Sequence, residues 1–76
     1  MAIKFSAHFL LRVKQRYQQP WATLVTTVER EMARQSLAPA RQGRWRFDFE
    51  DGSLRYRVIL AKQDRAVCTF ITFIRL

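Results

Sequence analysis

The segment from Arg44 to Glu50 alternates charged and aromatic side chains without a break. Successive side chains of a β-strand point to opposite faces, so this alternation predicts a strand that buries Trp45, Phe47 and Phe49. The dipeptide Asp51-Gly52 follows and favours a two-residue turn of type I′ that leads into a second strand. The segment therefore predicts a β-hairpin with one aromatic face and one charged face.

A turn centred on Asp51-Gly52 also predicts which residues of the hairpin face each other. The expected pairs are, on the buried face, Phe49 with Leu54, Phe47 with Tyr56 and Trp45 with Val58, and, on the outer face, Asp48 with Arg55 and Arg46 with Arg57. Two guanidinium groups opposite each other destabilise a strand pair, and a bound anion would relieve their repulsion. The alternative is that the two long side chains diverge into water.

Two segments before the hairpin have the periodicity of amphipathic helices. The first extends from Ala7 to about Gln18, with Ser6 as its N-cap, and the second begins at Pro20 and ends at about Gln35. The apolar stripe of the first consists of Phe9, Leu10, Val13 and Tyr17, and that of the second of Trp21, Leu24, Val25, Val28 and Met32. On the second helix, we interpret the opposite face as solvated surface; it carries Thr23, Thr27, Arg30 and Arg34.

The remaining segments complete an α+β pattern in a single domain of residues 1–76. Strands are expected at Ser53 to Lys62 and at Ala66 to Arg75, with a turn near Gln63-Asp64, and a connecting loop is expected at Leu37 to Gly43. The last strand is apolar on both faces, which requires a neighbour on each side, and the short segment Ile3 to Phe5 is the candidate. We therefore expect two N-terminal helices on one face of a curved antiparallel sheet of three or four strands, in the order ααβββ with a possible short N-terminal strand.

Arginine dominates the charged residues of the chain. The 76 residues include 14 Lys and Arg, of which 11 are Arg, against 6 Asp and Glu, for a net charge of +8. The guanidinium group binds phosphate through a planar set of N–H donors. A positive excess of this size predicts an anionic partner, either RNA or an acidic protein. The alternative is that the charge serves solubility alone.

The cysteine and histidine content excludes several classes of protein. The lone Cys68 forbids an intramolecular disulfide, and its apolar neighbours place it in a strand. One Cys and one His cannot supply the three or four soft ligands of a zinc site, so we expect neither a metal nor another cofactor. No apolar run approaches the roughly 18 residues of a membrane-spanning helix. We expect a cytoplasmic protein that does not associate with membranes.

The single histidine lies among arginines on the first helix. His8, Arg12 and Gln15 share one stripe of that helix, so a guanidinium would lie beside the imidazole. RNA can be cleaved without metal when a base takes the proton of its 2′-hydroxyl and cations stabilise the charge that develops on the phosphate. This grouping therefore favours a metal-independent ribonuclease. The alternative for His8 is an ordinary surface position near the start of a helix.

A resemblance to a known family rests on five short motifs. In chain order they are Phe5-Ser6-Ala7-His8, Arg12 with Arg16, Gly43-Arg44-Trp45-Arg46-Phe47, Tyr56-Arg57-Val58-Ile59, and Val67-Cys68-Thr69-Phe70-Ile71-Thr72. This order, which covers nearly the whole chain, resembles the RelE-like and BrnT-like bacterial toxins of the wider barnase-like and colicin-like ribonuclease group.

The resemblance implies a toxin ribonuclease that needs no metal and that a neutralising partner protein silences. It matches the helix histidine of that group to His8, the helix arginine to Arg12 or Arg16, the sheet arginine to Arg57, and the threonine of the last strand to Thr69 or Thr72. The sequence departs from the pattern at Phe9, where a small residue usually follows the histidine, and in lacking a carboxylate near His8. A non-catalytic relative therefore stays open.

Our leading hypothesis is an endoribonuclease toxin whose residues divide into two groups. The expected catalytic residues are His8 and Tyr56, which move protons, and Arg12 and Arg57, which bind the scissile phosphate; the expected substrate-binding residues are Arg16, Arg46, Arg55 and Thr72. One alternative is a nucleic-acid-binding module without catalysis. Another is a small inhibitor or adaptor whose arginines dock on an acidic protein, which an antitoxin would also be.

Overall fold

The computed structural model describes residues 2–62 and 66–76. Its elements are, in chain order, β1 (Ala2–Phe5), α1 (Ala7–Arg16), α2 (Trp21–Arg34), β2 (Ala38–Pro39), the 3₁₀ turn η1 (Arg41–Gly43), β3 (Trp45–Asp51), β4 (Leu54–Lys62) and β5 (Val67–Arg75). The α+β class and the helices expected from the sequence are confirmed. The turn expected at Gln63-Asp64 lies outside the described residues.

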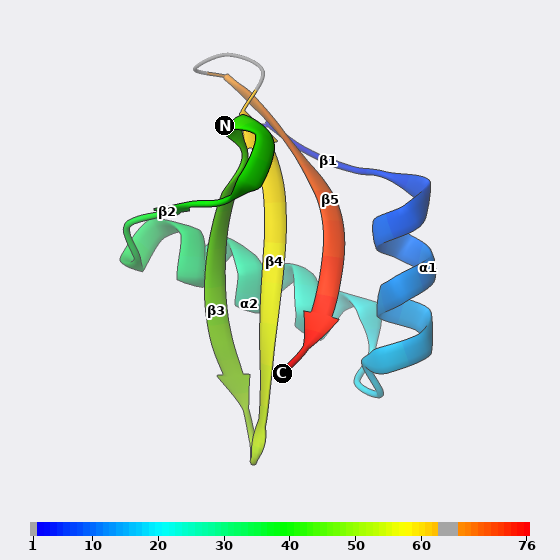
Figure 1. Ribbon diagram of the computed structural model, residues 1–76. Helices are drawn as coiled ribbons and strands as arrows, with labels where there is room; N and C mark the ends of the chain where they lie inside the picture. Colours follow the sequence, from blue (N-terminus) through cyan, green and yellow to red (C-terminus); the bar gives the residue numbers. More distant parts are fainter. Residues whose placement is uncertain (1, 63–65) are drawn as a thin grey trace.

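The sheet is mixed and has five strands in the order β1-β5-β4-β3-β2 (Figure 1). The sequence-based expectation of three or four antiparallel strands was wrong on two points. The expected loop at residues 37–43 contains β2, which pairs with β3 through only two residues and is too short to give a periodic signal. The segment β1 does lie beside β5, as expected, but runs parallel to it. Strand direction is a property of the chain's path and cannot be derived from periodicity.

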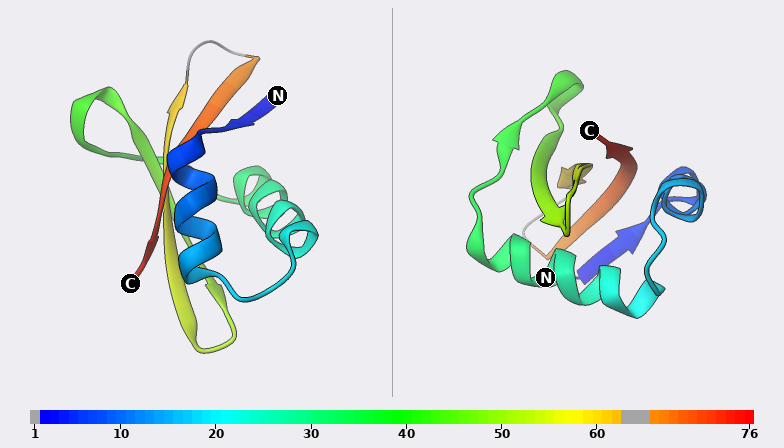
Figure 2. Two further views of the ribbon diagram at one scale, coloured as in Figure 1. Left: turned by 90° about the vertical axis from the view of Figure 1, so that its right-hand side faces the viewer. Right: turned by 90° about the horizontal axis from the view of Figure 1, so that it is seen from below.

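The two helices leave one face of the sheet uncovered. Helix α2 crosses behind the strands, and α1 lies along the β5 side of the sheet (Figures 1 and 2). The segment between β2 and β3 lies on the side of the sheet opposite α2 (Figure 2). We call the face that points away from α2 the open face.

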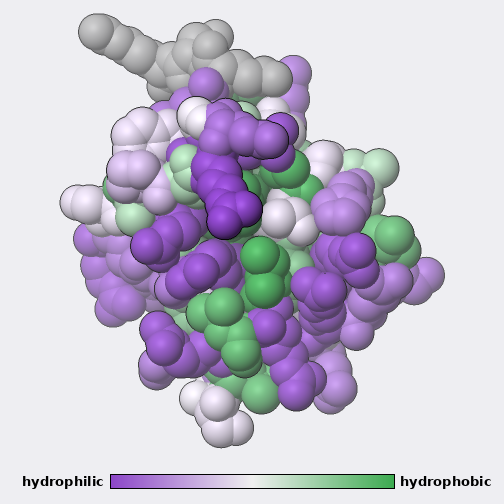
Figure 3. Space-filling model, in the orientation of Figure 1, coloured by the Kyte–Doolittle hydropathy of each residue, from purple (hydrophilic) through white to green (hydrophobic). Residues whose placement is uncertain are grey.

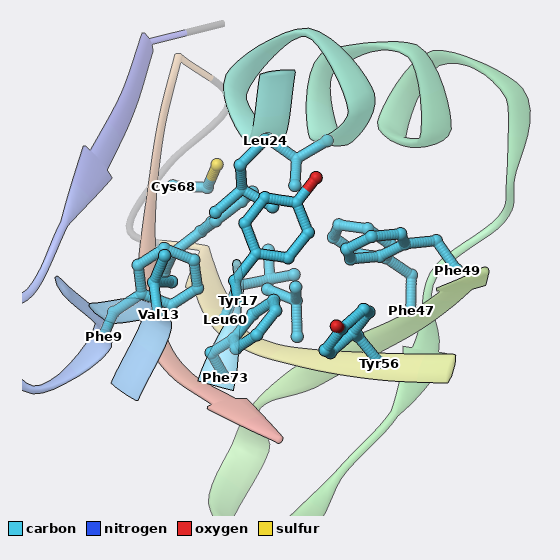
Figure 4. Close-up of a cluster of buried hydrophobic side chains, with 13 residues drawn as sticks. Phe9, Val13, Tyr17, Leu24, Phe47, Phe49, Tyr56, Leu60, Cys68 and Phe73 are labelled. Carbon is cyan, nitrogen blue, oxygen red and sulfur yellow. The ribbon is translucent and has the colours of Figure 1, made fainter. Parts of the chain in front are cut away.

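The core lies between the sheet and the helices and is rich in aromatic rings (Figure 4). The ring of Phe70, on β5, lies 5.4 Å from that of Phe9 on α1 and 6.0 Å from that of Phe47 on β3. Cys68 lies in β5, as its apolar neighbours predicted. Its side chain is fully buried, and burial raises the pKa of its thiol.

A local sequence signal accounts for the start of α1. Ser6 caps α1, because its hydroxyl accepts a hydrogen bond of 3.0 Å from the backbone N–H of Phe9, as expected.

The predicted surface face of α2 needs one correction, since Thr27 is buried and Glu31 is buried beside it. Glu31 accepts hydrogen bonds from the side chains of Arg34 and Gln35, which lower the pKa of its carboxyl. A charge with such partners can remain buried next to the sheet.

The hairpin forms where it was expected, but its register differs by two residues. The turn residues are Gly52 and Ser53, and the flanking pair is Asp51 with Leu54. Only Gly52 has a positive φ, 63°, whereas a type I′ turn would need one at both turn residues. A shift of two residues leaves every side chain on its expected face, so the aromatic residues of β3 still point into the core.

Candidate nucleic-acid interface

Strand alternation brings the basic side chains of the hairpin to the open face. Arg46 and Asp48 of β3 lie there beside Arg57 and Ile59 of β4, because the residues between them are the buried aromatic and aliphatic ones. Figure 3 shows this face as an apolar area bordered by hydrophilic side chains. The open face therefore combines positive charge with aliphatic surface.

The new register removes the expected clash between two arginines. Arg46 lies opposite Ile59, and Arg57 lies opposite Asp48. The guanidinium of Arg57 donates two hydrogen bonds to the carboxylate of Asp48, of 2.8 and 3.1 Å, while a guanidinium nitrogen of Arg46 lies 3.9 Å from the same carboxylate. The repulsion that an anion was expected to relieve is thus relieved by Asp48.

The bond with Arg57 lowers the pKa of Asp48 and raises that of Arg57. Because the folded pKa of Asp48 is below its unfolded value of about 3.9, the pair stabilises the protein above that value and stops doing so as the pH falls through the folded pKa. We expect Asp48→Asn to lower the free energy of unfolding at pH 7 by about 1 kcal/mol. The difference from wild type should shrink at pH 2 to 3.

Urea denaturation at both pH values measures this difference. Glu50→Gln is the matched control, because Glu50 and Arg55 form an exposed ion pair at 3.5 Å that should contribute little. A loss in Asp48→Asn that persists undiminished at the lower pH would show that the ion pair is not its cause.

A groove lies on the open face beneath the connection from β2 to β3. Its volume is about 640 Å³, and it is lined by Pro39, Ala40, Arg41, Gln42, Arg44, Arg46, Arg57, Ile59 and Ile74. Arg41 and Arg44 form no ion pair with any described residue. Sequence reasoning missed both, because Arg41 was part of the expected loop at residues 37–43 and Arg44 entered only as the first residue of the predicted strand. The available signal was the clustering of Arg41, Arg44 and Arg46 within six residues.

Helix α1 is fastened to the part of β5 that lies beyond its pairing with β1. That pairing ends at Phe70, which leaves the following carbonyl groups without a strand partner on this side. The Ser6 hydroxyl donates to the carbonyl of Ile71 at 2.9 Å, and the Arg16 guanidinium donates to the carbonyl of Phe73 at 2.9 Å. These bonds fix α1 against β5 and occupy Arg16 in a structural role.

His8 lies at the β5 margin of the open face. Its Nε2 is 3.1 Å from the Thr72 Oγ1, and its side chain is exposed. Thr72 faces Ile59 across the β5 and β4 pair, and Ile59 in turn faces Arg46. Adjacent strands lie about 4.8 Å apart, so the Cα atoms of Thr72 and Arg46 are separated by about 10 Å across this row. The imidazole therefore borders the basic surface without touching its arginines.

The structure separates the predicted site residues into groups. It brings His8 together with Thr72, and Arg46 together with Arg57. Tyr56 is buried in the core (Figure 4). It lies on the opposite sheet face from Arg57 and from Thr72, the partner of His8. The resemblance matched the threonine of the last strand to Thr69 or Thr72, and in the structure Thr72 is the one that contacts His8.

Within the described part of the chain, the remaining candidates, on α1, β4 and β5, form no hydrogen bond or ion pair with either group. Arg12 is partly exposed and donates a hydrogen bond of 3.1 Å to Gln15, on the same helix as His8. Arg55 is exposed at the start of β4, next to the hairpin turn, where it forms an ion pair with Glu50. The Oγ1 of Thr69 is buried and has no hydrogen-bond partner among the described residues.

The described residues contain neither a metal site nor a helix that could cross a membrane. Within residues 2–62 and 66–76, no three His, Cys, Asp or Glu side chains come together in a way that could hold a metal ion. No helix in the same ranges is long and apolar enough to span a membrane. Comparisons with protein families, with curated proteins and with solved structures find no match for this chain.

Proposed function

We propose that the open face binds RNA and that His8 promotes metal-independent cleavage of the bound strand, as in a toxin ribonuclease of the cytoplasm. The observation that carries the proposal is the exposed imidazole of His8, held by Thr72 at the margin of a face that also presents Arg41, Arg44 and Arg46. An acidic antitoxin would fit the same cationic face and would compete with RNA for it.

The proposed reaction uses the RNA itself as the nucleophile. The 2′-hydroxyl gives its proton to the imidazole, its oxygen bonds to the adjacent phosphorus, and the bond from phosphorus to the 5′-oxygen breaks. The protonated imidazole or water then gives a proton to that oxygen. The products are a 2′,3′-cyclic phosphate and a 5′-hydroxyl. The contact with Thr72 engages Nε2, and Nδ1, which has no partner among the described residues, is the nitrogen that exchanges the proton.

The arginines supply the positive charge that this reaction needs. The negative charge on the phosphate grows as the new bond forms, so nearby guanidinium groups stabilise the transition state. Arg12 lies one helical turn from His8. Arg46 lies two strands away from Thr72, because Thr72 of β5 faces Ile59 of β4 and Ile59 faces Arg46 of β3. Arg57 contributes less, since Asp48 neutralises it.

The direct test is incubation of the purified chain with unstructured RNA in excess EDTA. We expect fragments that end in 2′,3′-cyclic phosphate, and we expect an oligonucleotide of the same sequence with 2′-deoxyribose throughout to be bound and left intact. If the RNA is also left intact, the cleavage proposal is wrong.

One observation favours a second candidate, an RNA-binding module without catalysis. Tyr56 is in the core and Arg57 is paired with Asp48, so His8 is the only one of the predicted proton-transfer residues on the open side of the sheet. This candidate predicts RNA binding that weakens as salt is added, with RNA recovered intact.

A further inference from the structure

The groove beneath the connection from β2 to β3 has both cationic and aliphatic lining residues, and binding of the sugar-phosphate backbone of RNA would explain only the cationic ones. We infer that it is a nucleobase subsite, which takes one unpaired base and its 5′-phosphate. The inference deepens the proposed function and rests on it for the identity of the strand as RNA. It assigns single-stranded RNA as the substrate class, since a paired base could not enter.

The floor of the groove is aliphatic. Ile59 of β4 and Ile74 of β5 lie on the open face of neighbouring strands, and Pro39 of β2 borders the groove from the other side. A phosphate gains nothing from contact with hydrocarbon, because it must give up water to reach it. The flat face of a base gains free energy from such contact.

The rim of the groove is cationic, and one of its guanidiniums is held in a fixed plane. Asp48 binds Arg57 through two hydrogen bonds, which orient the guanidinium beside Ile59 and Ile74. A guanidinium plane of this kind stacks on nucleobases. Arg41 and Arg44 form no ion pair with a described residue, so they remain available to a 5′-phosphate.

The backbone over the groove is held in an unusual conformation. Gln42 has φ 60° and ψ 38°, and Gly43 has φ 71°, so two successive residues are left-handed. For a residue with a side chain this conformation is unfavourable, and such strain gathers at ligand sites. Gln42 also lines the groove, and its amide offers both a donor and an acceptor to the edge of a base. The volume, about 640 Å³, is within the usual range for small-molecule sites.

The test measures the binding of small fragments of RNA to the full chain, labelled with ¹⁵N, by NMR titration. The probes are the four nucleoside 5′-monophosphates, ribose 5-phosphate and the unphosphorylated nucleosides. We expect at least one nucleotide to bind at least about fivefold more tightly than ribose 5-phosphate, the difference being the contribution of the base. The largest amide shifts should lie in residues 40–46, at residues 57–59 and at Ile74.

Two variants separate the base from the phosphate. Ile59→Thr keeps a β-branched side chain and removes apolar surface, so it should reduce the preference for nucleotides over ribose 5-phosphate. Arg44→Ala should weaken the binding of both. Arg30→Ala, which removes the same charge from an exposed position of α2 behind the sheet, should change neither.

The subsite is overturned if ribose 5-phosphate binds as tightly as every nucleotide, or if the shifts lie outside the groove. This outcome is independent of cleavage, because no RNA is cut in the titration. A chain that binds nucleotides in the groove but leaves RNA intact would keep the subsite and lose the ribonuclease. A chain that cuts RNA but shows no preference for nucleotides would keep the ribonuclease and lose the subsite.

Discussion

RNA cleavage in EDTA is expected to slow by about 10²- to 10⁴-fold when His8 is replaced by alanine, because the variant loses the proposed proton acceptor. The fold should not change. His8 is exposed, and its one side-chain hydrogen bond among the described residues is with Thr72. Binding of RNA should also be retained, since the arginines proposed to bind phosphate are untouched.

Single-turnover cleavage measures the rate, and fluorescence anisotropy with an uncleavable 2′-deoxy oligonucleotide measures the binding. Tyr56→Phe is the control that separates this proposal from the sequence-based one, in which Tyr56 also moves protons. Because Tyr56 is buried in the core, we expect the variant to cleave at the wild-type rate. A His8→Ala protein that cuts as fast as wild type would remove His8 from the mechanism.

Phe70→Ala is expected to lower the free energy of unfolding by about 3 to 5 kcal/mol, the usual result of emptying a buried aromatic site. A domain of 76 residues has about 5 to 10 kcal/mol in total, so the variant should lose a large part of its stability. Phe70 is fully buried, and its ring contacts those of Phe5, Phe9 and Phe47. These contacts join β1, α1 and β3, so their loss should also loosen the placement of His8.

Chemical denaturation measures the loss of stability. Leu11→Ala is the matched control, since Leu11 lies on α1 with about half of its surface exposed and its replacement should cost about 0.5 kcal/mol or less. Equal losses in the two variants would show that the aromatic cluster is not the centre of the core.

Local patterns were enough to predict the hairpin, its faces and both helices. They were not enough for the hairpin register, because the expected and observed registers put every side chain on the same face and a contact from a distant part of the chain favours the observed one. The Tyr17 hydroxyl, at the end of α1, donates a hydrogen bond of 2.8 Å to the Asp51 carboxylate. Burial and this bond raise the pKa of Tyr17, so the hydroxyl stays a donor. Asp51 therefore ends β3 instead of entering the turn, and the turn moves on to Gly52 and Ser53.

The sequence allowed site residues to be predicted within one helix or one strand, but not the contacts between different elements. The His8 prediction depended on residue type and neighbours along one helix, and the structure adds Thr72 as its partner from β5. The Tyr56 prediction depended on the chemistry of the phenol alone, although the alternation of Tyr56 with Arg57 along the strand already puts the two on opposite faces. Arg41 and Arg44 come to line the groove through a chain path that returns over the sheet, which no local pattern records.

The bonds that fasten α1 to β5 also have a consequence for how copies of this chain can associate. An unpaired strand edge is a template for a strand of another molecule. Past Phe70, the carbonyls of Ile71 and Phe73 are already engaged by Ser6 and Arg16, so an incoming strand would first have to displace the helix that carries His8. Self-assembly along that edge and an intact arrangement of α1 are therefore mutually exclusive.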